Sequence, residues 1–309
     1  MKKYLCVDGG GTFVKHAVVT ADGTILSQSK YDTPCDDLEL FLDKIRELWE
    51  AEEGIAGIAL SMPGVIDIGR GFMHNAGAIR CCAGTNICEL VSERCGGVPV
   101  SVENDGKAAA RAEMVSGALK DCQSGVVIGL GTGIAGTVFI DRKIVRGSHL
   151  FGGEFSYNYR HSDRVFAGGH IGDRDERGQR YSSLCTPGGI VKGYAALSGK
   201  EGLTPKDCPY VFEQMENGDP DACRAVLSAA RDLAMMIFNI QCTVDPDAFA
   251  IGGGLSAQDR FIRMVQDAVQ AFVPADSPVC PTPVVKVCSY RNDANLIGAL
   301  YWHLERYGG

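Results

Sequence analysis

The alternation of apolar and polar residues predicts two α/β halves that each begin with antiparallel strands. Short runs rich in β-branched residues end at turns that contain Gly, Asp or Arg, which is typical of β-hairpins. Near residue 125 this pattern starts again, which indicates duplication of one supersecondary unit. The predicted strands cover residues 4–7, 13–19 and 24–29 in the first half, and 126–130, 137–140 and 144–146 in the second.

Apolar residues at helical spacing predict the helices between these strands. Residues 36–52 place Phe41, Leu42 and Ile45 on one face, with Asp36 as the expected N-cap. A buried strand over residues 55–61 and another over 248–251 each run into a glycine turn. Further helices are expected over residues 106–117 and 221–244, from about Asp259, and from about residue 292 to the end.

Two glycine-rich stretches directly follow predicted strands. One is DGGGT at residues 8–12, and the other is GLGTGIAG at residues 129–136. Glycine permits positive φ and a close approach of backbone amides, so such loops can bind phosphate oxygens. Between them, Asp105 ends another short apolar strand. Two candidate phosphate loops and one strand-end carboxylate favour phosphoryl transfer.

Neither loop is a standard nucleotide motif. The chain has no GxxxxGK[ST] sequence, which disfavours a P-loop NTPase. Gly131, Gly133 and Gly136 match the dinucleotide spacing, but the β-rich residues 137–140 follow, so a hairpin is expected instead of a helix. A tight hairpin without a ligand is the alternative for either loop alone. The later glycine turn at residues 252–254, together with Asp105, makes that alternative less favourable.

Composition limits the class of protein. With 309 residues, 45% hydrophobic and 22% charged, the chain can bury a large core, and we expect two domains. The expected division is residues 1–118 and 119–291, with a terminal helix over 292–309 packing back on the first domain. A net charge of -8 without a basic block argues against nucleic acid as a partner.

The cysteines and the apolar segments bear on localisation. Thirteen cysteines are scattered without a Cys-x-x-Cys pair, and no signal peptide precedes the first strand, so we expect a reducing cytoplasm. The longest uncharged stretch, residues 122–140, contains five glycines and makes a poor membrane span.

The ordered set of motifs resembles the ROK (repressor, open reading frame, kinase) family of sugar kinases over nearly the whole chain. The branch that it resembles lacks zinc and includes β-glucoside kinases. This resemblance implies an α/β, two-domain actin-like ATPase (ribonuclease H-like) fold in which sugar and ATP meet in a central cleft, and a homodimer. The motifs are DGGGT at 8–12, END at 103–105, LGTGIAG at 130–136, GGE at 152–154, DPD at 245–247, GGGLS at 252–256 and NDANLIGA at 292–299.

The resemblance also implies roles for individual residues. Asp105 is the expected general base, and Asp8 is suited to hold Mg²⁺ through water because hard cations prefer oxygen ligands. The alternatives are that Asp8 caps its own glycine turn and that Asp105 caps the following helix. The sugar would contact Asn104, Glu154, Gly64 and Tyr157; the ATP phosphates would contact Gly10, Gly11, Thr12, Thr132 and Gly133; and the adenosine would contact Gly253 and Gly254.

Two departures from the family pattern concern a structural zinc. Tyr157 stands where many members have a His, and the cysteine cluster of those members is absent. His161, His170 and Cys185 lie in the corresponding stretch at a spacing that fits no standard tetrahedral site, so we expect no zinc. The zinc-bearing members also have a second Glu that contacts the sugar, and it has no counterpart near residues 182–186. We therefore expect a pocket that is more open toward the anomeric carbon of the sugar and that accepts β-glucosides.

The predicted activity is transfer of the γ-phosphate of ATP to a sugar hydroxyl, with O6 as the expected acceptor. One alternative is a sugar-binding ROK regulator, although such proteins carry a DNA-binding segment ahead of the first glycine loop. Another is an ATPase that needs no sugar, against which Asn104 and Glu154 argue. Glucose, a β-glucoside, fructose and N-acetylmannosamine differ too little for this sequence to select among them.

Overall fold

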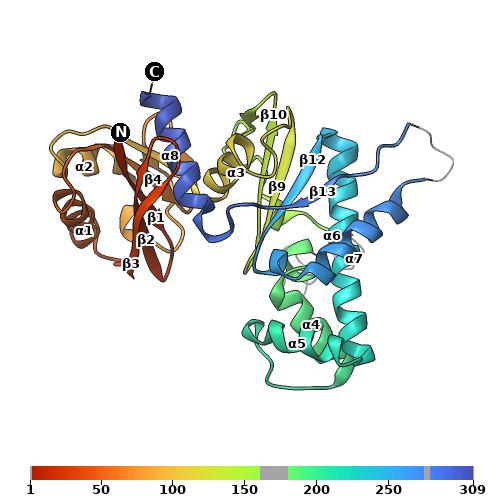
Figure 1. Cartoon of the computed structure of the whole chain (residues 1–309). Coiled ribbons are helices and arrows are strands. Elements are labelled where there is room, and N and C mark those ends of the chain that lie inside the picture. The colour runs from red at the N-terminus through yellow and green to blue at the C-terminus, as the bar shows by residue number, and fades with distance from the viewer. Residues whose placement is uncertain (1, 161–179, 275–278, 309) are drawn as a thin grey trace. The chain divides into compact units, whose positions relative to one another are not determined.

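The computed structural model describes residues 2–160, 180–274 and 279–308, which fold into two compact units (Figure 1). Unit 1 comprises Met1–Lys120, Arg146–Gly152 and Tyr290–Gly309, and unit 2 comprises Asp121–Val145 and Gly153–Ser289. The domain boundary expected between residues 118 and 119 stays a prediction. The two compact units differ from the expected domains in that Arg146–Gly152 groups with unit 1.

Unit 1 is built on a five-stranded mixed sheet in the order β3-β2-β1-β4-β8. Strands β1, β2 and β3 pair antiparallel, whereas β4 pairs parallel with both β1 and β8. The three opening antiparallel strands are therefore confirmed. The elements are β1 (Lys3–Gly9), β2 (Phe13–Thr20), β3 (Ile25–Asp32), α1 (Leu38–Glu50), β4 (Ile55–Met62), the small sheet of β5 (Ile66–Asp67), β6 (Phe72–Met73) and β7 (Thr85–Asn86), then α2 (Ile87–Arg94), β8 (Val100–Asn104), α3 (Asp105–Val115) and α8 (Ala294–Tyr307), with short 3₁₀ helices at Arg80–Cys82 and Arg291–Asp293.

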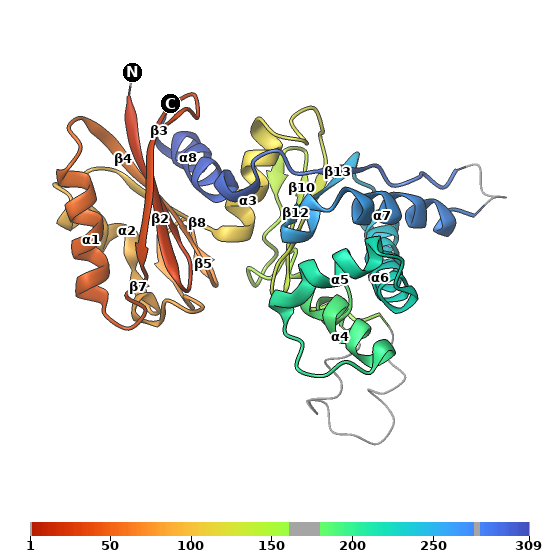
Figure 2. The ribbon, with the colours of Figure 1, turned by 60° about the horizontal axis from the view of Figure 1, so that its bottom comes forward.

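Helices cover both faces of this sheet (Figures 1 and 2). Phe41 and Ile45 of α1 pack with Leu5 and Val7 on one face. On the other face α3 and α8 pack against the sheet and against each other. A Cβ atom on Gly298 of α8 would lie 1.6 Å from the backbone oxygen of Ala108, so only glycine permits this close approach.

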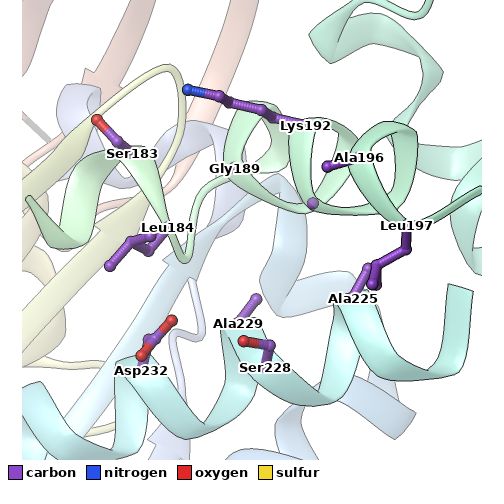
Figure 3. Close-up of a pocket in the computed structure, with 11 residues that line it drawn as sticks. Ser183, Leu184, Gly189, Lys192, Ala196, Leu197, Ala225, Ser228, Ala229 and Asp232 are labelled. Atoms are coloured by element: carbon purple, nitrogen blue, oxygen red, sulfur yellow. The ribbon is translucent and has the colours of Figure 1, made fainter. Parts of the chain in front are cut away.

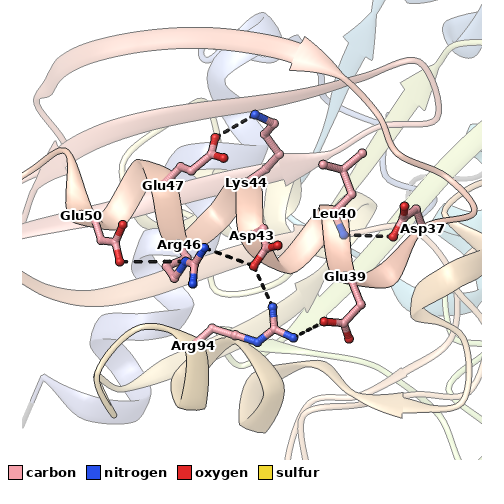
Figure 4. A network of polar contacts seen from close by, with 9 residues as sticks. All are labelled: Asp37, Glu39, Leu40, Asp43, Lys44, Arg46, Glu47, Glu50 and Arg94. Carbon is pink, nitrogen blue, oxygen red and sulfur yellow. Dashed lines mark hydrogen bonds and ion pairs between the residues drawn. The ribbon is translucent and has the colours of Figure 1, made fainter.

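The predicted N-cap of α1 is wrong by one residue. Asp37 is the cap, and its Oδ1 accepts a hydrogen bond from Leu40 N at 3.0 Å. Asp36 instead pairs with Arg80, whose Nε and Nη2 donate to the two carboxylate oxygens at 2.8 and 2.6 Å. Figure 4 shows the surface network along α1, in which Arg94 of α2 joins Glu39 and Asp43. Exposed pairs of this kind contribute little to stability, so burial of the apolar face holds α1 in place.

Unit 2 repeats the topology of unit 1. Its sheet has the order β11-β10-β9-β12-β13, with an antiparallel hairpin on one side and two parallel pairings on the other. This repetition confirms the predicted duplication. The elements are β9 (Gly125–Leu130), β10 (Ile134–Ile140), β11 (Lys143–Ile144), α4 (Pro187–Ser198), α5 (Cys208–Glu216), α6 (Pro220–Val244), β12 (Ala248–Gly253), α7 (Asp259–Phe272) and β13 (Val285–Val287), with 3₁₀ helices at Phe155–Tyr157, Tyr181–Ser183, Pro205–Asp207 and Gly254–Ala257.

The hairpin expected after the second glycine loop is present, because β9 pairs directly with β10. The next strand is shorter than predicted and ends at Ile144. Asp141 and Arg142 connect β10 to β11 with φ of 51° and 58°, the backbone of a tight two-residue hairpin turn. Arg146 leaves the sheet and belongs to unit 1.

One apolar core joins the sheet of unit 2 to its helices. Val226, Leu233 and Ile237 of α6 are fully buried together with Phe249 of β12. Met236 is buried and Met235 packs against the same cluster, as expected for core methionines. Among the described residues, no helix has the length and apolar character needed to cross a membrane.

Candidate active site

Three of the predicted site residues come together at one edge of the sheet in unit 1. Strands β1, β4 and β8 run parallel, and their register places Asp8 beside Ser61, Ser61 beside Glu103, and Met62 beside Asn104. Their carboxyl ends therefore bring Asp8, Asn104 and the following Asp105 to the same edge. In open α/β sheets this edge is where ligands bind.

Asp8 is a buried carboxylate with polar partners. Asp8 is only 6% exposed. Its Oδ1 accepts hydrogen bonds from Ser61 Oγ and Asn295 Nδ2, each at 2.9 Å. Burial raises the pKa of Asp8, while the bonds from Asn295 and Ser61 and the charge of Lys15 oppose that rise. Both bonds described for Oδ1 come from other elements instead of from the glycine turn that follows.

The first glycine loop connects β1 to β2 in a tightly held turn. Gly10 N donates to Phe13 O at 3.1 Å, and Thr33 holds the loop by donating from Oγ1 to Gly10 O at 2.6 Å and from N to Thr12 O at 3.0 Å. Gly10 and Gly11 have no positive φ. A Cβ on Gly11 would lie 2.8 Å from Ala78 Cβ, so close packing, and not a left-handed backbone, favours glycine here.

Asn104 and Asp105 occupy the start of α3. Asn104 is the N-cap, since its Oδ1 accepts from Lys107 N at 3.2 Å, and its Nδ2 donates to Gly64 O at 3.0 Å. Asp105 is the first helical residue, and its Oδ1 accepts from Gly106 N at 2.8 Å. The alternative that Asp105 caps α3 is therefore wrong, because Asn104 has that role.

The backbone conformation at position 64 requires glycine. Its φ is 102°, and a Cβ would lie 2.1 Å from Asn75 O. Together with Asn104, it borders a small cavity of about 10 Å³. Ile66, Lys107, Arg146 and Leu150 complete the described wall, so the segment Arg146–Gly152 reaches the predicted sugar side of unit 1.

The sequence analysis missed the partners of Glu103. Glu103 directly precedes Asn104 in the chain, and its carboxylate is fully buried. Arg146 Nη1 and Nη2 donate to Oε1 and Oε2 at 2.9 and 2.5 Å, and Arg111 Nη2 lies 3.5 Å from Oε2. A carboxylate inside a buried strand must be paired, which is the only signal the sequence offered.

The second glycine loop lies between β9 and β10 of unit 2. Gly131 N donates to Gly133 O at 3.0 Å, while Ser156 Oγ accepts from Ile134 N at 2.8 Å and thereby holds the start of β10. A Cβ on Gly133 would lie 2.8 Å from Ser156 Oγ. Thr132 is exposed at the tip of the loop.

Glu154 directly precedes the short 3₁₀ helix Phe155–Tyr157, and Tyr157 is the last residue of that helix. Ser156 of the helix holds the start of β10 just after the second glycine loop. A Cβ on Gly136 of β10 would lie 2.3 Å from Gly153 O, so the chain before Glu154 packs directly on the strand. The Tyr157 side chain is 52% exposed, and the guanidinium of Arg180 lies 5.3 Å from its ring centre.

The glycine turn after β12 borders a cavity of about 220 Å³. Gly253 has a φ of 81°, and a Cβ there would lie 2.3 Å from Leu130 O, whereas a Cβ on Gly254 would meet open space. The sequence identified the two glycines but not the opposite wall, which α4 and α5 bring in from earlier in the chain. The lining consists of Gly254 and Leu255 with Gln258, Pro187, Pro205, Cys208, Pro209 and Phe212.

A second cavity of about 310 Å³ in unit 2 contains none of the predicted site residues. It lies between α4 and α6, and Figure 3 shows Lys192 and Asp232 on these two helices. Asp232 is buried and pairs with Arg160 Nη1 at 3.1 Å. Small residues such as Ala225 and Ala229 form much of the remaining lining.

Two of the residues considered as zinc ligands, His161 and His170, lie outside the described residues. Cys185 is fully buried, its Sγ donates to Tyr181 O at 3.1 Å, and burial raises the pKa of its thiol. Within the described ranges, no three His, Cys, Asp or Glu side chains are grouped so that they could hold a metal ion.

Comparison with known proteins decides the family, since the profile of the ROK family matches residues 4–306. The chain belongs to the ROK family. It is 30% identical to a β-glucoside kinase of Klebsiella pneumoniae over 305 residues, covering 99% of this chain and 97% of that protein. A β-glucoside kinase of Listeria monocytogenes is 26% identical over 307 residues, with 98% of both chains covered.

Solved structures agree with this assignment. A ROK family protein from Streptococcus pneumoniae TIGR4, crystallised with sucrose, is 29% identical with a TM-score of 0.85 and 99% of both chains covered. The ROK hexokinase of Thermus thermophilus, at 24% identity and a TM-score of 0.81, supports the fold alone. The predicted α/β fold of the actin-like ATPase class is thus confirmed.

Proposed function

We propose that this ROK protein transfers the γ-phosphate of ATP to O6 of a hexose or β-glucoside, with Asp105 as the general base. The observation that carries the proposal is the meeting of Asp8, Asn104 and Asp105 at one sheet edge in a chain similar to β-glucoside kinases over almost its full length. The relatives named as β-glucoside kinase, glucokinase and N-acetylmannosamine kinase all support an ATP-dependent sugar kinase.

Asp105 would take the proton of the attacking hydroxyl. Phosphoryl transfer depends mainly on positioning and on neutralisation of charge, and one carboxylate facing the acceptor hydroxyl is enough. Asp105 lies in the first turn of α3, where the helix dipole favours negative charge, and its carboxylate would accept the proton late, as the hydroxyl becomes acidic.

Asn104, Gly64, Glu154 and Tyr157 would hold the sugar. The bonds of Asn104 to Gly64 O and Lys107 N fix the plane of its amide. An amide nitrogen carries two hydrogens, so after the bond to Gly64 one more can be donated to a sugar oxygen. A fixed amide loses little conformational freedom when it binds, which supports its role in orienting the acceptor.

The phosphates would lie against residues 10–12 and 132–133. Both loops end strands and are fixed by their own hydrogen bonds, so their backbone amides are ordered before any ligand binds. Asp8 fits the role of a Mg²⁺ partner through water, because its carboxylate is buried at the sheet edge and oriented by Ser61 and Asn295. When bound, Mg²⁺ neutralises charge on the phosphates.

Adenosine would occupy the cavity beside Gly254. Its described lining is mainly apolar, with three prolines, Leu255 and Phe212, which suits the flat face of a base. The open space above Gly254 leaves room for a ligand to approach the backbone. This cavity belongs to unit 2 alone.

Asp105→Asn tests the base assignment. We expect turnover to fall about a hundredfold or more, measured as ADP release, while sugar affinity measured by calorimetry changes much less. Asp43→Asn, a change on the exposed face of α1, is the matched control. Near wild-type turnover in a folded Asp105→Asn protein would overturn the assignment.

A panel of hexoses and β-glucosides tests the activity itself. We expect sugar-dependent ADP release and a 6-phosphorylated product. ADP release without sugar would indicate the ATPase alternative, and sugar binding without ADP release would indicate a regulator. Acceptance of a β-glucoside alongside glucose is expected, and rejection of every β-glucoside would contradict the open pocket predicted near Tyr157. We also expect a homodimer, which light scattering measures.

A further inference from the structure

Three cysteines of unit 1 form a cluster, of which Cys35 contacts the glycine loop at residues 10–12. Cys35 Sγ donates to Gly11 O at 3.3 Å, and Cys81 Sγ donates to Pro34 O at 3.4 Å. The sulfurs of Cys81 and Cys82 are 3.9 Å apart. The assignment of the protein as a sugar kinase gives these thiols no role.

The Cα atoms of Cys35 and Cys81 are close enough for a disulfide. Cys81 N donates to Cys35 O at 2.9 Å. Standard bond lengths then keep the two Cα atoms within about 7 Å of each other, the upper limit for a disulfide without movement of the backbone. On the surface, a bidentate pair between Arg80 and Asp36 also joins the two segments.

Cys82 is a poorer partner than Cys81. It is fully buried, whereas Cys35 and Cys81 are both partly exposed. A bond between the adjacent residues 81 and 82 would join Cα atoms about 3.8 Å apart, shorter than the usual disulfide range. Burial raises the pKa of the Cys81 thiol, and the nearby Cys35 adds to that rise, so the two sulfurs interact electrostatically.

We propose that Cys35 and Cys81 form an oxidative modification site, in which hydrogen peroxide converts the two thiols to a disulfide beside the loop at residues 10–12. The Cys35 thiolate attacks a peroxide oxygen, so that an S–O bond forms, the O–O bond breaks and hydroxide leaves as water with one proton. Cys81 sulfur then attacks the oxidised Cys35 sulfur. The S–S bond forms, the S–O bond breaks, and a second water carries away the Cys81 proton.

The disulfide changes what holds the glycine loop. Gly11 O loses the Cys35 S–H donor. Cys35 also becomes covalently tied to Cys81, in the segment that follows Ala78, and the Cβ of Ala78 lies next to Gly11. Thr33, two residues before Cys35, holds the carbonyls of Gly10 and Thr12. This consequence rests on the proposed role of residues 10–12 in binding ATP phosphates. The oxidised enzyme therefore loses affinity for ATP more than for sugar.

Peptide mapping under non-reducing conditions tests the bond directly. We expect peroxide-treated wild type to yield a Cys35–Cys81 linked peptide that dithiothreitol abolishes. The link is expected to persist in Cys82→Ser and in the control Cys242→Ser, an exposed cysteine of α6, and to vanish in Cys35→Ser and Cys81→Ser. A link through Cys82, or no link, would overturn the proposal.

Kinetics test the consequence for ATP. We expect oxidation to raise the KM for ATP about tenfold, with a smaller change in the KM for sugar and full recovery after reduction. Cys35→Ser keeps a hydroxyl donor for Gly11 O, so it is expected to stay active and to resist peroxide. Equal inactivation of Cys35→Ser and wild type would sink the proposal. If reduced wild type shows no sugar-dependent turnover, the proposed function fails, while the mapping result still stands.

Discussion

Arg146 and Glu103 form a bidentate ion pair in which the carboxylate is fully buried and the guanidinium is partly exposed, although 43 positions separate them in the chain. Glu103 Oε1 also accepts the backbone N–H of Asn104 at 2.8 Å. Arg146 is the first residue of the segment that returns from the sheet of unit 2 to unit 1. The pair thus anchors this segment on the strand that delivers Asn104 and Asp105.

Arg146→Met is expected to lower the free energy of unfolding by about 3 kcal/mol, because it leaves a buried carboxylate without its main partner. Turnover should fall about tenfold, since small displacements of a catalytic group are costly. Urea unfolding and ADP release measure the two effects. Arg142→Met, a change in the turn before β11, is the control that should alter both much less.

A double variant separates stability from positioning. Glu103→Gln with Arg146→Met removes both charges, so most of the lost stability should return. Turnover should stay low, because the ion pair that holds the Arg146–Gly152 segment on the strand before Asn104 is still missing. Recovery of turnover together with stability would show that the pair contributes to the fold only.

The neighbouring glycines 253 and 254 should respond differently to substitution. Gly253→Ala places a Cβ 2.3 Å from Leu130 O at a positive φ, so we expect the variant to unfold at lower urea concentration. Gly254→Val enters open space and should leave unfolding almost unchanged while raising the KM for ATP about tenfold or more. Unchanged nucleotide affinity in Gly254→Val would contradict the adenosine site.

The buried side chain of His303 makes the stability of the protein depend on pH. It is 1% exposed, its Nδ1 lies 3.0 Å from Ser101 Oγ, and burial lowers its pKa to about 4. In the unfolded chain this pKa is about 6.5, so the unfolded state binds the proton first as the pH falls. The stabilisation by neutral His303 is complete above about pH 6.5 and is lost toward pH 4, by roughly 3 kcal/mol in total.

Urea unfolding between pH 7 and pH 4.5 measures this dependence. His303→Gln should flatten the decline in stability below pH 6.5, even if it is less stable at pH 7. His74→Gln, a change at an exposed histidine of unit 1, should keep the wild-type slope. An unchanged slope in His303→Gln would refute the assignment.

Zinc should be unnecessary for activity. Tyr157 replaces the expected His, and Cys185 is buried in the core of unit 2. Purified protein should contain less than one zinc per chain, and turnover should survive a strong zinc chelator when Mg²⁺ is in excess. Because structural zinc supplies folding energy, a zinc-dependent loop would instead lose activity on chelation. Elemental analysis showing stoichiometric zinc would contradict this prediction.

The local patterns in the sequence were sufficient for the repeated architecture. Period-two runs ending at turn residues located the hairpins, and helical spacing located α1 and α6, because both signals depend only on neighbours along the chain. The N-cap of α1 was misplaced by one residue, since Asp36 and Asp37 are chemically alike and only the contact with Arg80 distinguishes them. The glycine loops were located by the same turn chemistry.

The sequence by itself determined that a glycine turn follows the strand before Gly254 and favours contact with a ligand, whereas it named Glu103 only as part of a motif. Only the tertiary structure decided that Arg146 pairs with Glu103 and that Pro187 and Phe212 face Gly254. It also decided that Cys81 lies beside Cys35. Such partners depend on how distant segments return to one sheet edge, and burial specifies the kind of partner required without specifying its position in the chain.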